Sequence, residues 1–509
     1  MTGPARRAQA LYGASTRDRR RSLEVPADEL VVAAGALLDQ GFRLALVAAA
    51  DGPGPLRVTY LFTAGPPDRR VELVVPVDRR RPQIPSLAEL SFPASRFERE
   101  IHDLFGIVPV GHPFLRRLVL HQHWPEGWYP MRQDAGPAPA MVDDAGPYPF
   151  VEVTGAGIYE IPVGPVHAGL IEPGHFRFSV VGETILKMKA RLWFVHKGIE
   201  RLFEGRNFGG GLELAERISG DTAVGHGLAY CLAVEEACGI ELPQRAAELR
   251  IVLLELERLY NHAADVGALC NDVGFGLANA KALTLRERLL RLNKRVTGHR
   301  LLRGGVQPSG ARVAALPTPA ELAEIGEQFN ECVDLALGQG TVMDRFTGTA
   351  VLGPADVEAL GVVGVAARAS GSTFDARLAH PFGDALPGFE SACATTGDVL
   401  ARFQVRVAEF GASLGVLADY CTRPGPLEAF GTGGRVSGLP SGSGIAEGWR
   451  GAIVHRVDLD GAGRLARVKV VDPSFFNWPA VSVALADTIV PDFPLVNKSF
   501  NLSYAGNDL

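Results

Sequence analysis

The chain has 509 residues, of which 47% are hydrophobic and 21% charged, as in globular proteins with more than one domain. Its net charge of −6 gives no reason to expect nucleic acid as a partner. No window offers the roughly 18 uninterrupted apolar residues of a membrane span, and the N-terminus lacks the apolar core of an export signal. We therefore expect a cytoplasmic protein that reaches a membrane, if at all, through partners.

The N-terminal region is predicted to fold as an α+β meander. We expect residues 17–21, which are rich in arginine, to form a flexible and solvated arm. The segment Val31 to Gln40 has the apolar spacing of a helix. Three alternating segments, separated by the turn sequences DGPGP and GPPD, then predict strands: FRLALVAAAD, LRVTYLFTA and RRVELVVPV.

An amphipathic helix is predicted from Phe97 to Phe105, where Gly106 ends it. The pattern alone fits a surface helix whose exposed ion pairs contribute little. The sequence EREIHDLFGI, which is followed by GHP and LRR, resembles the 30-kDa-type subunit of respiratory complex I. This resemblance implies an α/β docking domain without redox chemistry of its own. Residues 130–134 depart from the family, because they read PMRQD in place of P-RKD.

A linker is predicted at residues 134–149, which are rich in Pro, Gly and Ala. We therefore expect the docking domain to span residues 1–133 and a second domain to span residues 150–509. Many versions of complex I keep such modules as separate chains, whereas the formate hydrogenlyase type fuses them.

The second domain opens with a Gly- and Pro-rich loop that carries His167, Glu172 and His175. An alternating segment with Gly182 at its turn follows, and it predicts a pair of strands. A helix is then predicted from His196 to Glu204. Together these features predict a polar loop held over a sheet edge, although a solvated hairpin with incidental histidines fits the pattern equally well.

This opening, GPVHAGLIEPGHFRFSVVGE followed by HKGIERLFE, resembles the large subunit of membrane-bound, energy-converting (group 4) NiFe hydrogenases of the formate hydrogenlyase type. It is less closely similar to the 49-kDa-type quinone-site subunit of complex I, the NADH-quinone oxidoreductase. The segments ELERLYNHAADVGALC and RGGVQP fit the same family. The resemblance implies an α+β fold, in which the docking domain precedes a mainly α-helical domain with small β elements at its edges.

Helical periodicity dominates the rest of the second domain. Glu255, Arg258 and His262 recur about one turn apart on a helix that is otherwise apolar. Because buried charges are costly unless paired, this pattern predicts an ion-pair network in the core of a bundle, with structural pairing favoured over a proton relay. Residues 338–352 are predicted to form a loop.

The six cysteines are scattered, and none belongs to a C-x-x-C pair: Cys231, Cys238, Cys270, Cys332, Cys393 and Cys421. In a reducing compartment such spacing predicts free thiols, with buried roles for those that lie among Ala and Leu. It argues against an iron–sulfur or zinc site in this chain.

The hydrogenases that this chain resembles hold nickel with four cysteine thiolates, which are supplied by the motifs R-I-C-G-x-C-x-x-x-H and D-P-C-x-x-C. The corresponding segments here are RISGDTAVGH at 217–226 and KSFNLSYAGNDL at 498–509. They place other residues at all four cysteine positions: Ser219, Thr222, Ser503 and Gly506. Since hydroxyl groups are hard ligands that stay protonated, we expect no NiFe centre and no hydrogen chemistry. The chain also stops at Leu509, which fits a protein with no maturation peptidase to serve.

The resemblance to complex I implies another use for the vacated cavity, because that branch lost the same thiolates and binds a quinone there. His167 matches the first histidine of its motif, and His175 approximates the second despite a small difference in length. The tyrosine that completes the quinone site falls at Gly220, so that donor is missing.

The candidate catalytic residues are His167, Glu172, His175, Arg217 and Asp221. In hydrogenases the glutamate that corresponds to Glu172 lies near the cluster and takes part in metal binding or proton transfer. Beside His175 it fits a proton relay or a hydrogen-bonded structural pair about equally well. The vacated ligand positions and Tyr504 are the candidates for lining the cavity.

Two functions stay open. In the first, electrons pass from an iron–sulfur cluster on a small partner subunit to a quinone or another carrier, and this chain holds no cofactor itself. In the second, the chain is a non-catalytic coupling subunit between the iron–sulfur subunit and membrane-embedded antiporter-like and quinone-module subunits. Four retained residues favour the first, namely His167, Glu172, His175 and Arg217, and Gly220 favours the second. Both imply a peripheral position on the cytoplasmic face of a membrane.

Overall fold

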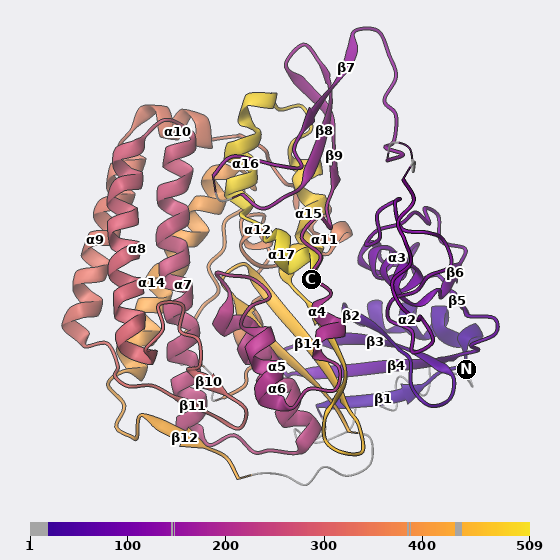
Figure 1. The fold of residues 1–509 in the computed structure, drawn as a ribbon. Coiled ribbons are helices and arrows are strands. Elements are labelled where there is room, and N and C mark those ends of the chain that lie inside the picture. Colours follow the sequence, from indigo (N-terminus) through magenta and orange to yellow (C-terminus); the bar gives the residue numbers. More distant parts are fainter. Residues whose placement is uncertain are drawn as a thin grey trace.

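The computed structural model describes residues 19–143, 146, 148–169, 171–383, 386, 388–432 and 440–509. Three layers lie side by side in Figure 1. A sheet from the N-terminal domain lies on the right, a second sheet lies in the middle, and a bundle of long helices lies on the left. Among the described residues, no helix is long and apolar enough to cross a bilayer.

The N-terminal domain is built on a four-stranded sheet in the order β1-β4-β3-β2. Its strands are β1 (Arg20–Glu24), β2 (Arg43–Ala50), β3 (Leu56–Ala64) and β4 (Arg69–Val77). β1 pairs parallel with β4, and the other neighbours are antiparallel. Helix α2 (Leu30–Leu38) packs on this sheet. The predicted helix and the three predicted strands are confirmed.

The expectation of a flexible arm at residues 17–21 is wrong from Arg19 onward, and the two residues before it lie outside the described part. Arg20 begins β1, and its guanidinium lies 2.9 Å from the Glu72 carboxylate. Arg19 pairs at 3.2 Å with Glu236 of the second domain. Carboxylates far along the chain therefore fix residues whose local charge pattern is typical of a solvated tail.

Helix α3 (Phe92–Phe105) ends at Gly106, whose φ of 70° makes the left-handed C-cap that the sequence predicts. Its charged side chains are largely buried. Asp103 accepts hydrogen bonds from the backbone amides of Leu118 to Leu120 at 2.7 to 3.2 Å. Two short parallel strands flank this helix in the sequence: β5 (Gln83–Pro85) and β6 (Val108–Val110).

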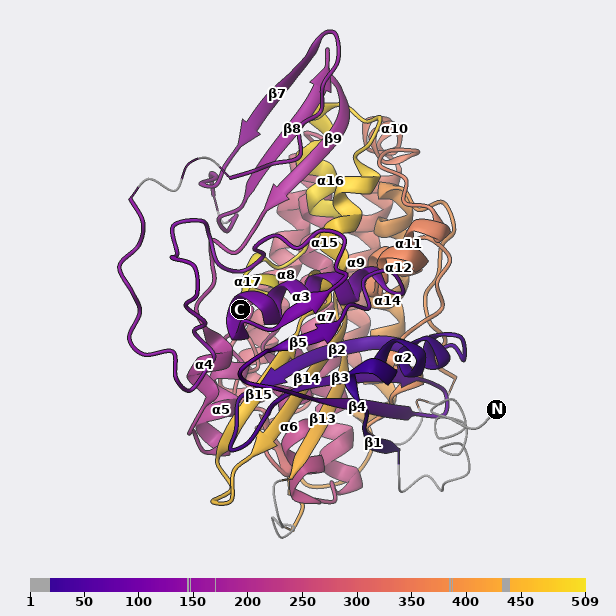
Figure 2. The ribbon, with the colours of Figure 1, turned by 90° about the vertical axis from the view of Figure 1, so that its right-hand side faces the viewer.

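The middle sheet consists of three antiparallel strands: β13 (Ser441–Gly448), β14 (Gly451–Leu459) and β15 (Leu465–Val471). Helix α6 (Ala223–Cys238) lies against β13. Gly442 and Gly444 permit this contact, because a Cβ atom at these positions would lie 2.0 and 1.9 Å from carbonyl oxygens of α6. The expectation of small β elements at the edges is therefore wrong for this sheet, which lies between the helices and the N-terminal sheet (Figure 2).

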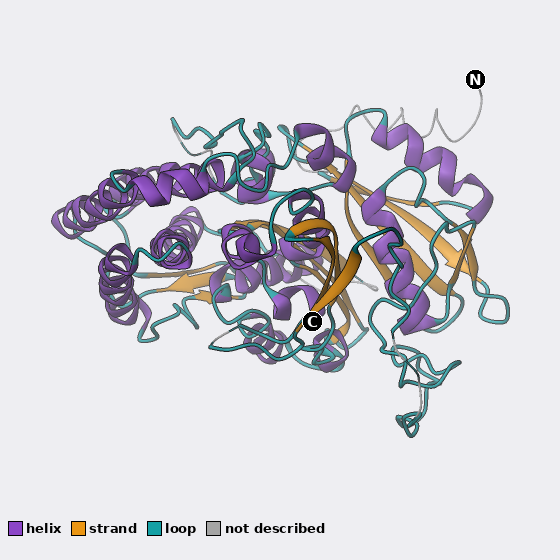
Figure 3. Ribbon diagram, turned by 90° about the horizontal axis from the view of Figure 1, so that it is seen from above, coloured by secondary structure: helices purple, strands orange, loops and turns teal. Residues whose placement is uncertain are grey.

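Four long helices form the bundle, which Figure 3 shows from above. They are α7 (Gln244–Asp272), α8 (Gly276–Thr297), α9 (Pro319–Leu337) and α14 (Val399–Tyr420). The loop predicted at residues 338–352 instead contains helix α10 (Gly340–Phe346). Val342 and Phe346 are buried there, so packing overrides the weak helix propensity of the segment.

A small antiparallel sheet projects above the other layers in Figure 2. It consists of β7 (Ile158–Val163), β8 (His175–Val181) and β9 (Thr184–Arg191), and Gly182 lies in the turn as predicted. The helix expected from His196 begins only at α4 (Ile199–Phe203). The backbone amides of Lys197 and Gly198 donate to the carbonyl oxygen of Leu509 instead, at 2.7 and 3.1 Å.

Shorter elements connect these layers. They are α5 (Phe208–Ala215), α11 (Pro354–Leu360), α12 (Gly364–Arg368), α13 (Ala376–Ala379), α15 (Pro473–Ala484), α16 (Phe493–Phe500), α17 (Tyr504–Asp508), β10 (Val306–Gln307), β11 (Gly310–Arg312) and β12 (Glu428–Phe430).

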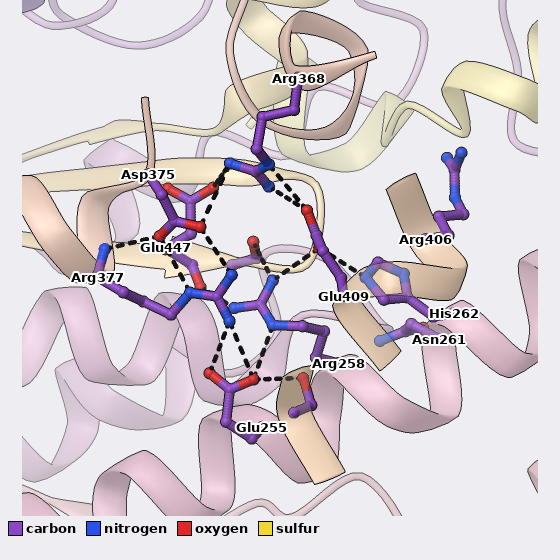
Figure 4. A network of polar contacts seen from close by, with 12 residues as sticks. Glu255, Arg258, Asn261, His262, Arg368, Asp375, Arg377, Arg406, Glu409 and Glu447 are labelled. Atoms are coloured by element: carbon purple, nitrogen blue, oxygen red, sulfur yellow. Dashed lines mark hydrogen bonds and ion pairs between the residues drawn. The ribbon is translucent and has the colours of Figure 1, made fainter. Parts of the chain in front are cut away.

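The core of the second domain contains the predicted ion-pair network (Figure 4). Arg258 Nε donates to Glu255 at 3.0 Å, and His262 Nε2 lies 2.8 Å from Glu409. Further arginines and carboxylates extend the network into α12, α13 and β13: Arg368, Asp375, Arg377 and Glu447. Because these buried groups are paired across α7, α14 and β13, the prediction of a core network is confirmed.

Candidate functional site

A cavity of about 840 Å³ lies beneath the loop between β7 and β8. Its polar lining comes from that loop, from the segment before α6, and from α7, α8 and α16. The apolar part of the lining includes Ile171, Phe176, Phe493 and Leu502. The cavity therefore combines hydrogen-bonding groups with flat and branched apolar surfaces.

The two segments that correspond to the metal-binding motifs meet in this cavity. The Ser219 and Ser503 hydroxyl oxygens lie 2.8 Å apart, although 284 residues separate them in the sequence. Ser503 Oγ also accepts a hydrogen bond from the Gly506 amide at 2.9 Å, and so caps the start of α17. The structure thus brings together the segments that the resemblance placed at one site.

Asp221 forms a two-pronged ion pair with Arg450, at 2.7 Å for each contact. The Ser219 and Thr222 hydroxyls donate to the same carboxylate at 2.9 and 3.0 Å. Burial alone would raise the pKa of Asp221, but Arg450 and these hydroxyls hold it well below its ordinary value. Asp221 is therefore an ionised anchor, which suits positioning better than proton transfer.

Helix α7 fixes the loop that carries these residues. The Asp221 carbonyl oxygen accepts hydrogen bonds from Tyr260 at 3.0 Å and from Asn261 at 2.9 Å. Glu257 accepts from the Val224 and Gly225 amides, at 2.6 and 2.9 Å, in the first turn of α6. Burial raises the pKa of Glu257 to about 8. The loop is therefore held from behind by a helix that also carries part of the core network.

The loop between β7 and β8 places His167 and Glu172 in the cavity lining. His167 Nε2 lies 2.7 Å from the Gly174 carbonyl oxygen, and Glu172 accepts from the Ala505 amide at 3.0 Å. Gly164 is required for this closure, because its φ is 83° and a Cβ atom there would lie 2.2 Å from the Gly174 oxygen. Glu172 thus links the loop to the first turn of α17.

His175 and Arg217 lie outside the cavity lining. His175 Nδ1 lies 3.1 Å from the Gly164 carbonyl oxygen, and its ring faces Phe150. His175 and Glu172 thus have different hydrogen-bond partners in the structure, Gly164 and Ala505. Arg217 is exposed beyond the end of α5 and donates to the carbonyl oxygen of Glu213 at 2.6 Å. Arg217 matches the motif in its sequence position, but its side chain points outward.

The four vacated ligand positions do not fit a NiFe centre. Ser219, Thr222 and Ser503 are hydrogen-bonded within the protein, and Thr222 accepts from Trp449 at 3.1 Å. At Gly506 a Cβ atom would lie 2.5 Å from the Asp472 carboxylate, which pairs with His226 at 3.0 Å. A side chain at that position would displace this buried pair, and hydroxyl oxygens cannot replace thiolates toward nickel.

Several cavity residues were missed in the sequence reasoning: Arg450, Asp272, Arg286 and Lys498. Arg450 comes just before β14, and no motif pointed to it. Tyr504, named only as a candidate, also lines the cavity, and its ring packs against Trp478 with 4.9 Å between centroids. Burial raises the pKa of Tyr504 to about 12, so its hydroxyl stays protonated and can donate a hydrogen bond.

Comparisons with known proteins support the resemblance. Residues 23–139 match the family of the respiratory-chain NADH dehydrogenase 30 Kd subunit, and residues 272–428 match that of the 49 Kd subunit. Formate hydrogenlyase subunit 5 of Escherichia coli is 33% identical over 85% of this chain and 78% of its own length. The C/D subunit of the NADH-quinone oxidoreductase of Bacteroides thetaiotaomicron is 30% identical over 72% of this chain and 74% of its own length.

The fold is also shared with a chain of the membrane-bound sulfane sulfur reductase, an archaeal respiratory membrane complex. The TM-score is 0.63 at 24% sequence identity, over 69% of this chain and 99% of the other. The relatives are thus subunits of oxidoreductase complexes, and the matches cover parts of both the N-terminal domain and the second domain. The chain therefore belongs to the family of hydrogenase and complex I-type subunits that includes formate hydrogenlyase subunit 5 and the C/D subunits of NADH-quinone oxidoreductase.

Proposed function

We propose that this chain binds a quinone, or a similar organic carrier, in the cavity at Ser219 and Ser503 and supports its reduction. Electrons come from an iron–sulfur cluster of a small partner subunit, and antiporter-like membrane subunits couple the reaction to ion translocation. The observation that carries the proposal is the cavity itself. Its volume of about 840 Å³ lies in the range of small-molecule sites, roughly 300–1,000 Å³, and its oxygen-lined floor carries hydroxyl groups where a NiFe centre would need thiolates.

The lining suits a flat ring with two carbonyl oxygens. Phe176 and Phe493 supply an apolar wall, and the Tyr504 hydroxyl supplies a neutral donor. The Tyr504 oxygen lies 3.4 Å from Asn497 Nδ2, which leaves its own O–H free to donate to a ligand. Tyr504 thus takes the place of the donor that Gly220 lacks.

Reduction of a quinone to a quinol consumes two electrons and two protons, so the cavity needs groups that can hold protons. Asp272 lines it, and burial raises the pKa of this carboxyl. Lys498 lies on the same wall and lowers that pKa in part. His167 and Glu172 are the further titratable groups of the lining loop. The cavity therefore offers proton-holding groups beside the proposed ring site.

Substitution Tyr504→Phe is expected to weaken the binding of a quinone analogue to the assembled complex by about three- to tenfold, the value of one hydrogen bond. Packing should persist, because the ring keeps its contact with Trp478. Tyr159→Phe is the matched control, since the Tyr159 hydroxyl donates to Gly182 at 2.7 Å on the projecting sheet, outside the cavity. A titration of the analogue against both variants and the wild type measures the difference, and equal affinities in all three would refute the role of Tyr504.

The same titration with His167→Ala separates the two functions left open by the sequence. A carrier site predicts measurable binding in the wild type and a clear loss in the variant, because His167 holds the loop over the cavity. Equal and negligible binding in both proteins would contradict the redox role. It would favour the coupling role, which is also favoured by Gly220 at the position of the quinone-site tyrosine.

A further inference from the structure

A second groove, separate from the cavity, follows the seam between the two domains. Its volume is about 490 Å³. Its walls are α3, the segment Tyr148 to Val151, β9 and α15. In Figure 2, α3 and α15 lie between the N-terminal sheet and the projecting sheet, to which β9 belongs. The groove exists only where the docking domain and the second domain meet.

Positive charge dominates this groove. Its lining holds four arginines and no acidic residue among those described: Arg96, Arg99, Arg116 and Arg191. None of the four forms an ion pair within the described part of the chain. They donate mostly to neutral carbonyl oxygens, as Arg99 does to Arg116 and Arg117 at 2.7 and 3.0 Å. The chain therefore leaves these charges without an opposite charge in contact.

Burial in the groove disfavours the charged form of Arg96 and Arg191. Burial and the neighbouring Arg99 lower the pKa of Arg96 to about 9, and burial also lowers the pKa of Arg191. Arg191 is only 4% exposed, and its Nε–H is buried without a hydrogen-bond acceptor among the described residues. A buried donor and several guanidinium groups without a carboxylate in contact both favour an anion in the groove.

Aromatic side chains rim the same groove. Phe92 and Phe114 are 39% and 44% exposed. The Arg116 guanidinium lies over the Phe114 ring at 4.4 Å, and that of Arg191 lies over Tyr148 at 4.8 Å. A lone inorganic anion would leave these apolar surfaces uncovered. A peptide that presents a carboxylate beside an apolar side chain would cover both features.

We propose that this groove binds an acidic peptide segment of another subunit, with an Asp or Glu carboxylate against Arg99, Arg116 and Arg191 and an apolar side chain against Phe114. The relatives of this chain are subunits of multi-subunit complexes, which supplies the setting for such a partner. The bound segment contacts both domains at once and stabilises their seam.

The test places a photo-crosslinking benzoylphenylalanine at Phe114 in the assembled complex. We expect cross-linking to an Asp- or Glu-containing segment of another subunit, identified by mass spectrometry. The control carries the same group at Val32, which is 58% exposed on α2, away from the groove. A cross-link at Phe114 to lipid only, to a segment without acidic residues, or to nothing in an intact complex would overturn the proposal.

Charge reversal at the groove supplies the second measurement. Arg116→Glu is expected to lower the cross-linking yield at Phe114 at least tenfold, whereas Arg116→Lys retains most of it. Arg81→Glu is the matched control, because Arg81 is exposed in the N-terminal domain outside the groove and should leave the yield unchanged. The same yield with Arg116→Glu as with Arg116→Lys would show that charge does not recruit the segment.

Discussion

Arg368→Met is expected to lower the free energy of unfolding by about 3–5 kcal/mol, the loss typical of a broken buried ion pair. Arg368 is fully buried, and it lies 2.8 Å from both Glu409 and Glu447. It also approaches Asp375 at 3.6 Å (Figure 4). The methionine fills a similar volume but leaves these carboxylates facing one another without their shared cation.

The sign of the pH dependence follows from the same contacts. Burial already raises the pKa of Glu447 in the folded protein, and Arg368 counteracts this rise, so the pKa of Glu447 in the variant rises further above its value in the unfolded chain. The folded variant then binds more protons than the unfolded chain, and its stability falls as pH rises through that interval. We therefore expect a larger difference from the wild type at pH 8 than at pH 5.

Urea unfolding followed by tryptophan fluorescence measures both effects. Arg312→Met is the matched control, because Arg312 and Glu428 form a pair at 2.8 Å whose side chains are 65% and 60% exposed. Its expected effect is below about 0.5 kcal/mol. If Arg368→Met were as mild as this control, the network of Figure 4 would not hold the core together.

Arg450→Met is expected to lower the free energy of unfolding by about 2–3 kcal/mol and to loosen the cavity floor. The expected loss is smaller than for Arg368, because the Asp221 side chain is 37% exposed to the cavity and partly solvated. Arg450 also donates to the Asn501 carbonyl oxygen, so its loss removes one of the links between the two motif segments.

The stabilising contribution of the pair between Asp221 and Arg450 also depends on pH. The pKa of Asp221 in the folded protein is held below the ordinary value of 3.8, so the pair contributes fully above that pH. Its contribution is lost as pH falls below about 3.8 toward the folded pKa. The difference between the wild type and Arg450→Met should therefore be constant near neutral pH and shrink in acid. A difference that grows toward low pH would contradict an ionised Asp221.

Local patterns predicted the elements whose determinants are local. Gly106 ends α3 and Gly182 turns the β8–β9 hairpin, because both adopt backbone angles that glycine favours. The core network was also foreseen, since Glu255, Arg258 and His262 place charge on a helix that is otherwise apolar. Such features can be deduced from residues a few positions apart.

The errors occurred where distant residues decide the structure. Arg20 lies in a strand because its guanidinium forms ion pairs with the carboxylates of Glu72 and Glu236. Arg450 could not be recognised as part of the site, because its partner Asp221 precedes it by 229 residues. Arg217 was chosen for its place in a motif, but its side chain points to solvent. In these cases the fold determines the role of the side chain, and sequence spacing does not contain that information.

The most direct test of the carrier site is a structure of the assembled complex with a bound quinone analogue. We predict density for the analogue in the cavity, with a carbonyl oxygen within hydrogen-bonding distance of the Tyr504 hydroxyl and the ring against Phe176. Density for the analogue only outside this cavity, or an anomalous nickel peak between Ser219 and Ser503, would contradict the proposed function.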